Sequence, residues 1–141
     1  MAAWMETHRA VVFPWHCDHI GHMNVRWYAH FFDDAGFHLW TRIGLTPAEL
    51  KRRGIVTVIA SAKTDFQHEL NAGDLLIIDS AFTRLGNSSL NHFQRMRNAE
   101  TGVLSATQET VEVFFDLTTR KAVTMPDDIR KMLAAALVTE I

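Results

Sequence analysis

The most regular pattern of apolar and polar positions lies between residues 25 and 43. Asn24 can cap the start of this segment with its side-chain oxygen, and Gly44 is a suitable end for a helix. The pattern therefore predicts a long helix over about residues 25–43. Its apolar side chains recur every three or four residues and share one helix face: Tyr28, Phe31, Phe32, Ala35 and Leu39.

After Gly54 the apolar pattern changes to a period of two residues, which is typical of β-strands. Thr46-Pro47 begins a short helix before that glycine, and Pro126 begins a terminal helix. The buried face of the terminal helix is predicted to carry Ile129, Met132, Leu133, Ala136 and Leu137. The predicted strands, separated by turn-forming residues, cover residues 9–15, 55–66, 75–84, 88–97, 103–115 and a short segment near 122–123.

This order of elements predicts one α+β domain covering residues 1–141, with an antiparallel sheet of five or six strands. One long helix can cover only one face of such a sheet. The other face then needs a different cover. A second copy of the chain is the simplest one, so we expect a homo-oligomer.

Composition narrows the class of protein. Hydrophobic residues make up 48% of the chain, the formal net charge is -2, and Lys and Arg form no run, which argues against a nucleic-acid partner. Cys17 is the one cysteine, which suits a reducing compartment. We see no signal-peptide pattern and no stretch long enough to span a bilayer. We therefore expect a cytoplasmic protein with no membrane partner.

The candidate chemistry lies in residues 16–24 (HCDHIGHMN), a polar loop that runs from a strand end into a helix start. Unpaired amides at a helix start carry partial positive charge and bind anions or polarised carbonyl oxygens. Asp18 can attack a carbonyl carbon, or activate a water molecule, while these amides hold the oxygen. An Asp in such a loop is also a common turn or cap residue, so the spacing alone indicates acyl transfer without establishing it.

The segment Asp-x-x-Gly-His-x-Asn, followed by a long helix with an aromatic residue in its first turn, resembles the 4-hydroxybenzoyl-CoA thioesterase-like group of the hotdog superfamily. Later landmarks of the group are matched by Gly73-Asp74, by residues 84–89 (RLGNSS) and by Asp116 with Thr119-Arg120-Lys121, so the likeness covers nearly the whole chain. The matching residues of the first segment are Phe13, Asp18, Gly21, His22, Asn24 and Tyr28.

The resemblance implies a hotdog fold, in which the sheet wraps a long central helix and two subunits form one continuous sheet, often pairing again to a tetramer. It implies an acyl-CoA thioesterase that needs no cofactor, because coenzyme A is part of the substrate. Asp18 would be the nucleophile or general base, and the amide of Val25 would polarise the thioester carbonyl. We expect His22 and Asn24 to shape the loop rather than to transfer protons.

Other functions fit parts of the same loop. A metal site can draw its ligands from His16, Cys17, Asp18, His19 and His22, but no second pair of ligands stands out elsewhere in the chain, and we expect no metal. Cys17 as a nucleophile is doubtful because neighbouring residues of an extended segment point to opposite faces. Asp34 on the long helix is a reserve catalytic acid, since another branch of hotdog enzymes places its acid there.

Two further alternatives concern the reaction itself. Hotdog hydratases and dehydratases typically place Asn before His after the Asp, whereas here His22 precedes Asn24. A non-catalytic acyl-CoA-binding protein would hold the bare carboxylate of Asp18 beside an apolar pocket, which is costly. Both remain open as alternatives to the thioesterase.

Substrate contacts are predicted in two places. Trp15 and Trp27 flank the Asp18 loop and, together with Tyr28, can shape a pocket for an aliphatic, aromatic or betaine-like acyl group. Core packing is the alternative role of these aromatic residues. Arg84 and Ser88, in the second turn of the resemblance, are candidates for contacts to the coenzyme A phosphates, with an ordinary exposed strand face as the alternative.

Overall fold

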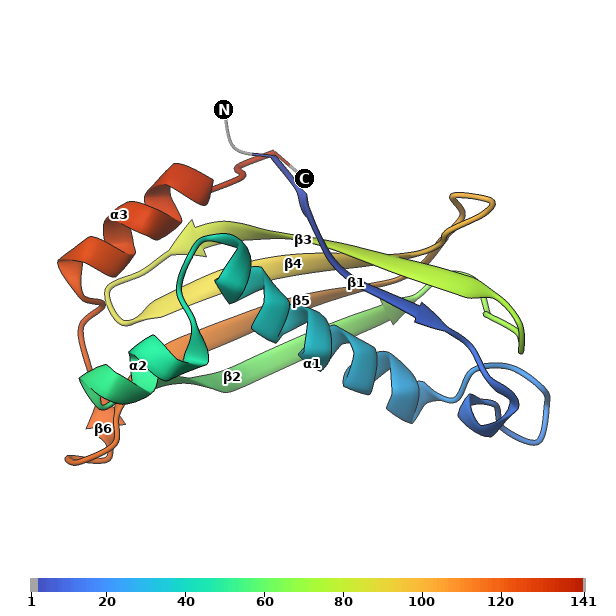
Figure 1. Ribbon diagram of the computed structural model, residues 1–141, viewed down its shortest axis with the longest axis horizontal. Helices are drawn as coiled ribbons and strands as arrows, with labels where there is room; N and C mark the ends of the chain where they lie inside the picture. Colours follow the sequence, from blue (N-terminus) through green and yellow to red (C-terminus); the bar gives the residue numbers. More distant parts are fainter. Residues whose placement is uncertain (1–2, 141) are drawn as a thin grey trace.

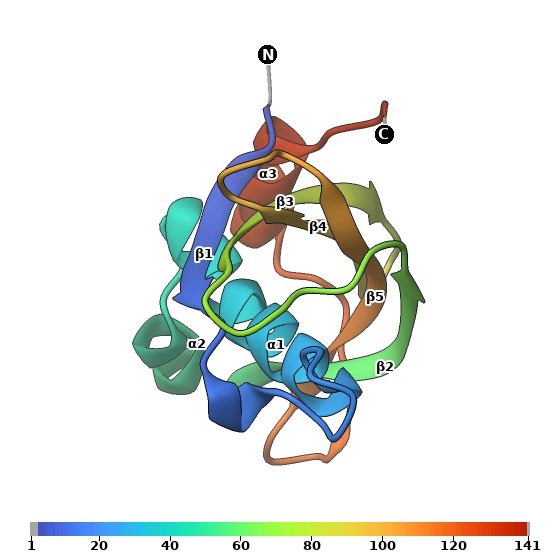
Figure 2. The same cartoon turned by 90° about the vertical axis from the view of Figure 1, so that its right-hand side faces the viewer.

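The computed structural model describes residues 3–140 and shows a curled sheet with helices on its concave side (Figure 1, Figure 2). In chain order the elements are β1 (Met5–Val11), the 3-10 turn η1 (Pro14–His16), α1 (Val25–Arg42), α2 (Pro47–Arg53), β2 (Ile55–Phe66), β3 (Leu75–Leu85), β4 (Ser89–Asn98), β5 (Leu104–Asp116), β6 (Lys121–Ala122) and α3 (Asp127–Ala136).

The strands form one sheet in the order β1-β3-β4-β5-β2, and the short β6 pairs with β5. Every strand pair is antiparallel. The predicted α+β class and antiparallel sheet are therefore confirmed. Consecutive strands β3, β4 and β5 are neighbours, whereas β1 and β2 lie at the two ends of this order.

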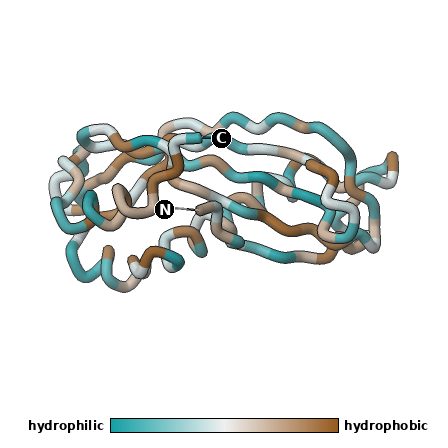
Figure 3. Tube along the Cα trace, turned by 90° about the horizontal axis from the view of Figure 1, so that it is seen from above, coloured by the Kyte–Doolittle hydropathy of each residue, from teal (hydrophilic) through white to brown (hydrophobic). Residues whose placement is uncertain are grey.

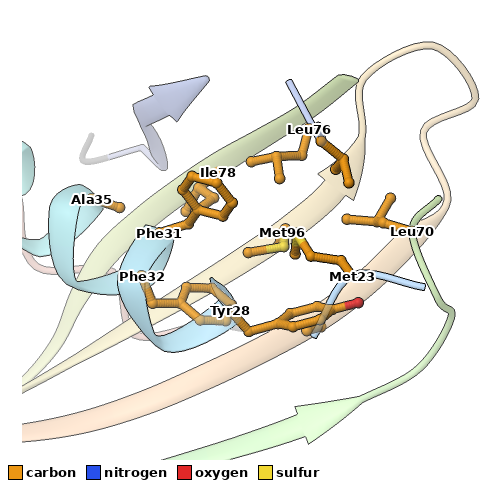
Figure 4. Close-up of a cluster of buried hydrophobic side chains, with 11 residues drawn as sticks. Met23, Tyr28, Phe31, Phe32, Ala35, Leu70, Leu76, Ile78 and Met96 are labelled. Atoms are coloured by element: carbon orange, nitrogen blue, oxygen red, sulfur yellow. The ribbon is translucent and has the colours of Figure 1, made fainter. Parts of the chain in front are cut away.

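α1 begins at the predicted residue and ends at Arg42, one residue earlier than predicted. The side chain of Asn24 accepts a hydrogen bond from the Arg26 amide at 3.1 Å, and Gly44 adopts the positive φ of 88° that follows the helix. The predicted apolar face packs onto the sheet, against residues such as Ile78 and Met96 (Figure 4). Its members Tyr28, Phe31, Phe32, Ala35 and Leu39 are all buried.

The predicted bounds of the first strand are wrong. It covers Met5–Val11, not residues 9–15, and its last register pair joins Val11 to Leu75. Pro14 has no N–H to donate to a ladder and instead begins η1. The early half of the strand is polar in sequence, yet Thr7 is buried there because its hydroxyl lies 2.8 Å from the Ser80 hydroxyl on β3.

Along much of the central strands, every second residue is buried. Hydrophobic and hydrophilic residues are interspersed along the chain (Figure 3). On the concave side α3 closes one end of the core, where Ile129 and Leu133 join Trp40, Phe82 and Phe114. Elsewhere along α3, the predicted Met132 and Ala136 are only partly buried.

The opposite, convex face of the sheet is mixed in character. Arg95 donates two hydrogen bonds to the Asp79 carboxylate, at 2.9 and 2.5 Å, and its guanidinium lies 3.6 Å from the centre of a Trp4 ring. A face that carries such an ion pair can remain in water. The predicted homo-oligomer thus gains no support from this face. In the described residues no helix is both long and apolar enough for a membrane span.

Candidate active site

Residues 17–23 form a tight hairpin between η1 and α1. Cys17 pairs with Met23, and the Asp18 amide donates to the His22 carbonyl at 2.9 Å. The Gly21 amide donates to the Asp18 carbonyl at 3.0 Å. Gly21 has a φ of +93°, which side-chain-bearing residues rarely adopt, so the turn depends on glycine at this position.

The carboxylate of Asp18 lies at the tip of this hairpin and is partly exposed. Its Oδ1 accepts a hydrogen bond from the Ile20 amide at 2.9 Å. This hydrogen bond is the main cause that lowers the pKa of Asp18 below its ordinary value. The side chain is therefore a carboxylate at neutral pH, as both a nucleophile and a general base must be.

Asn24 organises the start of α1 with three hydrogen bonds. Its amide donates to the His16 carbonyl at 2.8 Å, its carbonyl accepts from Trp27 N at 2.9 Å, and its side chain accepts from Arg26 N at 3.1 Å. Of the first three helix amides, this leaves Val25 N without an acceptor among residues 3–140. An unpaired amide at a helix start is suited to bind a carbonyl oxygen.

The histidines of residues 16–24 differ in burial and in their contacts. His16 is buried, and its Nδ1 accepts a hydrogen bond from Phe13 N at 2.9 Å; burial lowers its pKa. His22 is half-exposed, with Nε2 3.9 Å from Oε1 of Glu69. Within residues 3–140, no group of three or more His, Cys, Asp or Glu side chains is arranged to hold a metal ion.

The predicted aromatic residues have unequal exposure. Trp15 is 66% exposed and stacks on Phe13, with ring centres 4.4 Å apart. Trp27 is half-buried against His16. Tyr28 is only 4% exposed, its hydroxyl lies 3.4 Å from the Ser105 hydroxyl, and burial raises its pKa. Tyr28 is thus part of the core in a single chain, while Trp15 is free to contact a ligand or a second copy.

Arg84 and Ser88 lie far from the hairpin. β3 starts at Leu75 beside the hairpin end of the sheet and carries Arg84 nine residues further on, which is about 30 Å along an extended strand. Figure 1 shows the two regions at opposite ends of the molecule. One chain therefore does not bring Arg84 and Ser88 to Asp18.

A cavity of about 670 Å³ lies between α1 and β2, with α2 at one end, and we call it the α1–β2 cavity. Arg26, in the first turn of α1, is among its lining residues, whereas the neighbouring Val25 is not. Asp18 and the other predicted site residues are not among its lining residues. The side of α1 that faces the cavity overlaps the side packed on the sheet, since Phe32 and Trp40 line the cavity and also belong to the core.

The cavity floor is polar, which the sequence pattern did not predict. His92 and Glu112 are buried there, and Thr57, Gln108 and Thr110 lie beside them. The sequence did contain a sign of this polar floor. In β4 every second residue is buried, and two of the buried positions between Leu90 and Met96 carry the polar residues His92 and Gln94. Without knowledge of the strand register, these residues could not be placed around one cavity.

A family model described as the thioesterase-like superfamily matches residues 11–133. The chain belongs to this superfamily. The matched segment contains the Asp18 hairpin, α1 and the strands β2 to β6. The resemblance seen in the sequence is therefore confirmed at the level of the superfamily. No curated protein sequence matches the chain.

Solved structures of similar fold agree with this membership. SAV2348 of Staphylococcus aureus, solved in complex with CoA, is 21% identical with a TM-score of 0.88, and the match covers 100% of this chain and 90% of that one. Slr0204 of Synechocystis, a 1,4-dihydroxy-2-naphthoyl-CoA thioesterase, is 18% identical with a TM-score of 0.79, covering 90% and 93%. The curled antiparallel sheet with helices fits the predicted hotdog fold.

Proposed function

We propose that this member of the thioesterase-like superfamily hydrolyses acyl-CoA thioesters, with Asp18 as its catalytic carboxylate. The observation that carries the proposal is that one short hairpin leads from the Asp18 carboxylate, fixed at its tip, to the unpaired Val25 amide at the start of α1. Acyl transfer needs a base or nucleophile and a donor for the developing oxyanion. The hairpin and the helix start supply one of each.

In the proposed reaction, the thioester carbonyl oxygen accepts a hydrogen bond from Val25 N–H. As a general base, Asp18 takes a proton from water as the water oxygen bonds to the carbonyl carbon. The C–S bond then breaks, the acid is released, and the proton goes to the coenzyme A thiolate. As a nucleophile, Asp18 forms a mixed anhydride with loss of the thiolate, and water then cleaves the anhydride.

His22 and Asn24 hold these groups in place. The His22 backbone closes the hairpin through the Asp18 amide, and Asn24 occupies the two neighbouring helix amides, so that Val25 alone is available. A thiolate is a good leaving group, so the reaction needs little help from a general acid. Neither side chain is required for proton transfer in this proposal.

We propose that the acyl portion enters the α1–β2 cavity, which is lined by Arg26 in the first turn of α1. Trp15 and Trp27 lie on the hairpin side, where they can contact the thioester end of the substrate. We propose that Arg84 and Ser88 meet the coenzyme A of a substrate bound at another subunit, because they lie far from Asp18 in their own chain. The CoA complex of the similar SAV2348 supports a CoA thioester as the substrate.

A hydrolysis screen tests the proposal. The wild-type protein and Asp18→Asn are incubated with aliphatic, aromatic and betaine-like acyl-CoA thioesters, and free thiol is measured. We expect at least one thioester to be cleaved by the wild type and to be stable with Asp18→Asn. Cleavage of none of them, or equal cleavage by both proteins, would contradict the proposal.

A further inference from the structure

Gly36 is the one glycine of α1, and it lies in the interior of the helix. Glycine at such a position lowers stability relative to alanine, because it has more backbone freedom to lose on folding. Gly36 is not among the glycines with positive φ, so its backbone does not require glycine. A Cβ atom here would lie 3.9 Å from His92 and from the Gln94 side chain, an ordinary contact distance. The fold therefore has room for alanine.

The buried Gln94 side chain joins β4 to α1 at this point. In the amide orientation that satisfies both neighbours, it donates to the Phe32 carbonyl at 3.0 Å and accepts from the Gly36 amide at 3.1 Å. Both hydrogen bonds use backbone atoms of the helix, which alanine would also provide. The contact with Gln94 therefore does not explain why residue 36 lacks a side chain.

Gly36 also lines the α1–β2 cavity, and other lining residues lie on both sides of it along the chain. Arg26 precedes it in α1, whereas Trp40 and Leu50 of α2 follow it. The cavity therefore extends along α1 past Gly36. A side chain at this position would narrow the space between the helix and His92 on the cavity floor, since its Cβ would already contact His92.

The polar groups of the cavity floor are paired with one another. His92 Nδ1 lies 2.9 Å from Glu112 Oε2, and both atoms are closed to solvent. Thr57 donates to the other oxygen of Glu112 at 2.9 Å, and Thr110 donates to Gln108 at 3.3 Å. The remaining lining is largely apolar and suits a hydrocarbon chain. Its apolar members include Phe32, Phe37, Trp40, Leu50, Val56 and Ile59.

We infer that Gly36 determines the length of the acyl chain that the cavity accepts, and that the substrate carries a linear hydrocarbon chain long enough to pass this residue. The inference rests on the proposed function, which brings the acyl portion into the cavity from the start of α1. Gly36 follows Val25 by eleven residues, which is about 16 Å along the helix. An extended chain of single bonds advances about 1.25 Å per carbon, so about thirteen carbons reach Gly36.

The test compares saturated acyl-CoA thioesters from hexanoyl to hexadecanoyl. The wild type should prefer tetradecanoyl-CoA to hexanoyl-CoA by about tenfold or more in kcat/KM, because each added methylene is buried. A leucine in a helix directs its side chain toward the preceding turn, which here contains Phe32 and Asp33 of the cavity lining. Gly36→Leu should therefore lower kcat/KM on tetradecanoyl-CoA by about tenfold or more and change that on hexanoyl-CoA by less than about threefold.

Two further variants complete the test. Gly36→Ala should raise the midpoint of urea denaturation, because alanine favours the helix, and should still lower kcat/KM on tetradecanoyl-CoA by about threefold or more. It decides the question if Gly36→Leu does not fold. Thr41→Leu adds a leucine to the same helix at an exposed position outside the cavity and should keep the wild-type dependence on chain length.

Binding without turnover separates this inference from the proposed function. Isothermal titration calorimetry with the thioethers S-hexyl-CoA and S-tetradecyl-CoA, below their critical micelle concentrations, measures the same preference as a ratio of Kd values. Tighter binding of the tetradecyl compound that is lost in Gly36→Leu, with no thioester hydrolysed, would leave the inference standing and overturn the proposed function. Equal kcat/KM and equal Kd at all chain lengths in the wild type, or a length dependence that the Gly36 variants retain in full, would overturn the inference.

Discussion

The carboxylate of Asp18 and the backbone amide of Ile20 are joined by a hydrogen bond of 2.9 Å that closes the tip of the hairpin. An Asn side chain can accept the same hydrogen bond through its amide oxygen. Replacement of Asp18 by Asn therefore removes the charge while keeping the turn. This separates the catalytic from the structural role of the residue.

We predict that Asp18→Asn lowers kcat on the best acyl-CoA by at least about a hundredfold, because the base or nucleophile is lost while the oxyanion donor stays. The melting temperature should change little. His22→Ala serves as the comparison and should lower the rate much less. Equal losses in both variants, with a step of the pH–rate profile that is lost in His22→Ala, would make His22 the base.

The Val25 amide can be removed without breaking the helix. Val25 is the first residue of α1, where proline is well tolerated, and Asn24 already has the extended φ of -71° and ψ of 146° that a residue before proline requires. Val25→Pro should keep the unfolding free energy within about 1 kcal/mol of wild type. It should lower kcat by about a hundredfold or more, since the oxyanion loses its donor.

Val25→Ala is the matched control, because it shortens the same side chain and keeps the amide. It should retain the wild-type kcat to within about threefold. Steady-state kinetics on one substrate compare the variants. A Val25→Pro protein with wild-type kcat would exclude the amide as the oxyanion donor.

Asn24→Ala should cost about 1 kcal/mol of stability, measured by urea denaturation, because the Arg26 amide loses its acceptor. It should also lower kcat moderately by misplacing the first turn of α1. Asn24→Ser can still cap the helix and should recover most of both losses. Recovery of stability without recovery of kcat would assign Asn24 a direct contact with substrate.

Burial lowers the pKa of His16 from 6.5, so the folded state binds a proton less readily than the unfolded state does. The stability that His16 contributes is therefore present above pH 6.5 and is lost as the pH falls below that value. His16→Asn keeps an acceptor for the Phe13 amide but cannot titrate. Its unfolding free energy should fall less steeply from pH 6.5 downward, although the variant starts from a lower value.

His8 should also make the protein less stable as the pH falls, since burial lowers its pKa too. His16→Asn should thus flatten only part of the pH dependence, and the double variant with His8→Asn should flatten more. Denaturant unfolding at a series of pH values measures the slopes. An unchanged slope in the double variant would show that neither histidine controls acid stability.

We predict at least a homodimer formed through β2, with a tetramer as a further step. β2 lies at one end of the sheet order, and Val58, Ile59 and Phe66 on it are 41%, 55% and 51% exposed. A long edge strand with exposed apolar side chains pairs readily with another chain. Light scattering should give a multiple of the monomer mass at micromolar concentration.

Val58→Lys should weaken this assembly by placing a charge on the edge strand. Val103→Lys is the matched control, because Val103 is similarly exposed, at 44%, but lies in the turn between β4 and β5. It should assemble like the wild type. A monomeric wild-type protein would contradict the prediction.

The helical half of the fold could be predicted because its information is local. α1 has its cap, its apolar period and its terminal glycine within its own sequence, and all three are found where they were predicted. β1 could not be placed in the same way. Thr7 is buried, and its hydroxyl has its hydrogen-bonding partners on Ile78 and Ser80, which are far away in sequence. A polar residue gives no local sign of such a partner.

The same limit applies to the site. The hairpin and the helix start are adjacent in sequence, so Asp18, Asn24 and Val25 could be considered together. The cluster of His92 and Glu112 depends on strand register, since His92 lies opposite Thr110 and reaches Glu112 diagonally. Register follows from the packing of the whole sheet, and the cavity beside it depends on how α1 lies over that sheet.

The three hydrogen bonds of Asn24 also have a consequence for motion. They connect the carbonyl of His16 in η1 with the amides of Arg26 and Trp27 in α1, across both ends of the hairpin. Opening either element alone would break bonds shared with the other, so the two should exchange their amide hydrogens as one cooperative unit. The distance between the Asp18 carboxylate and the Val25 amide would then stay constant while distant parts of the sheet fluctuate, and substrate binding would have little ordering left to do.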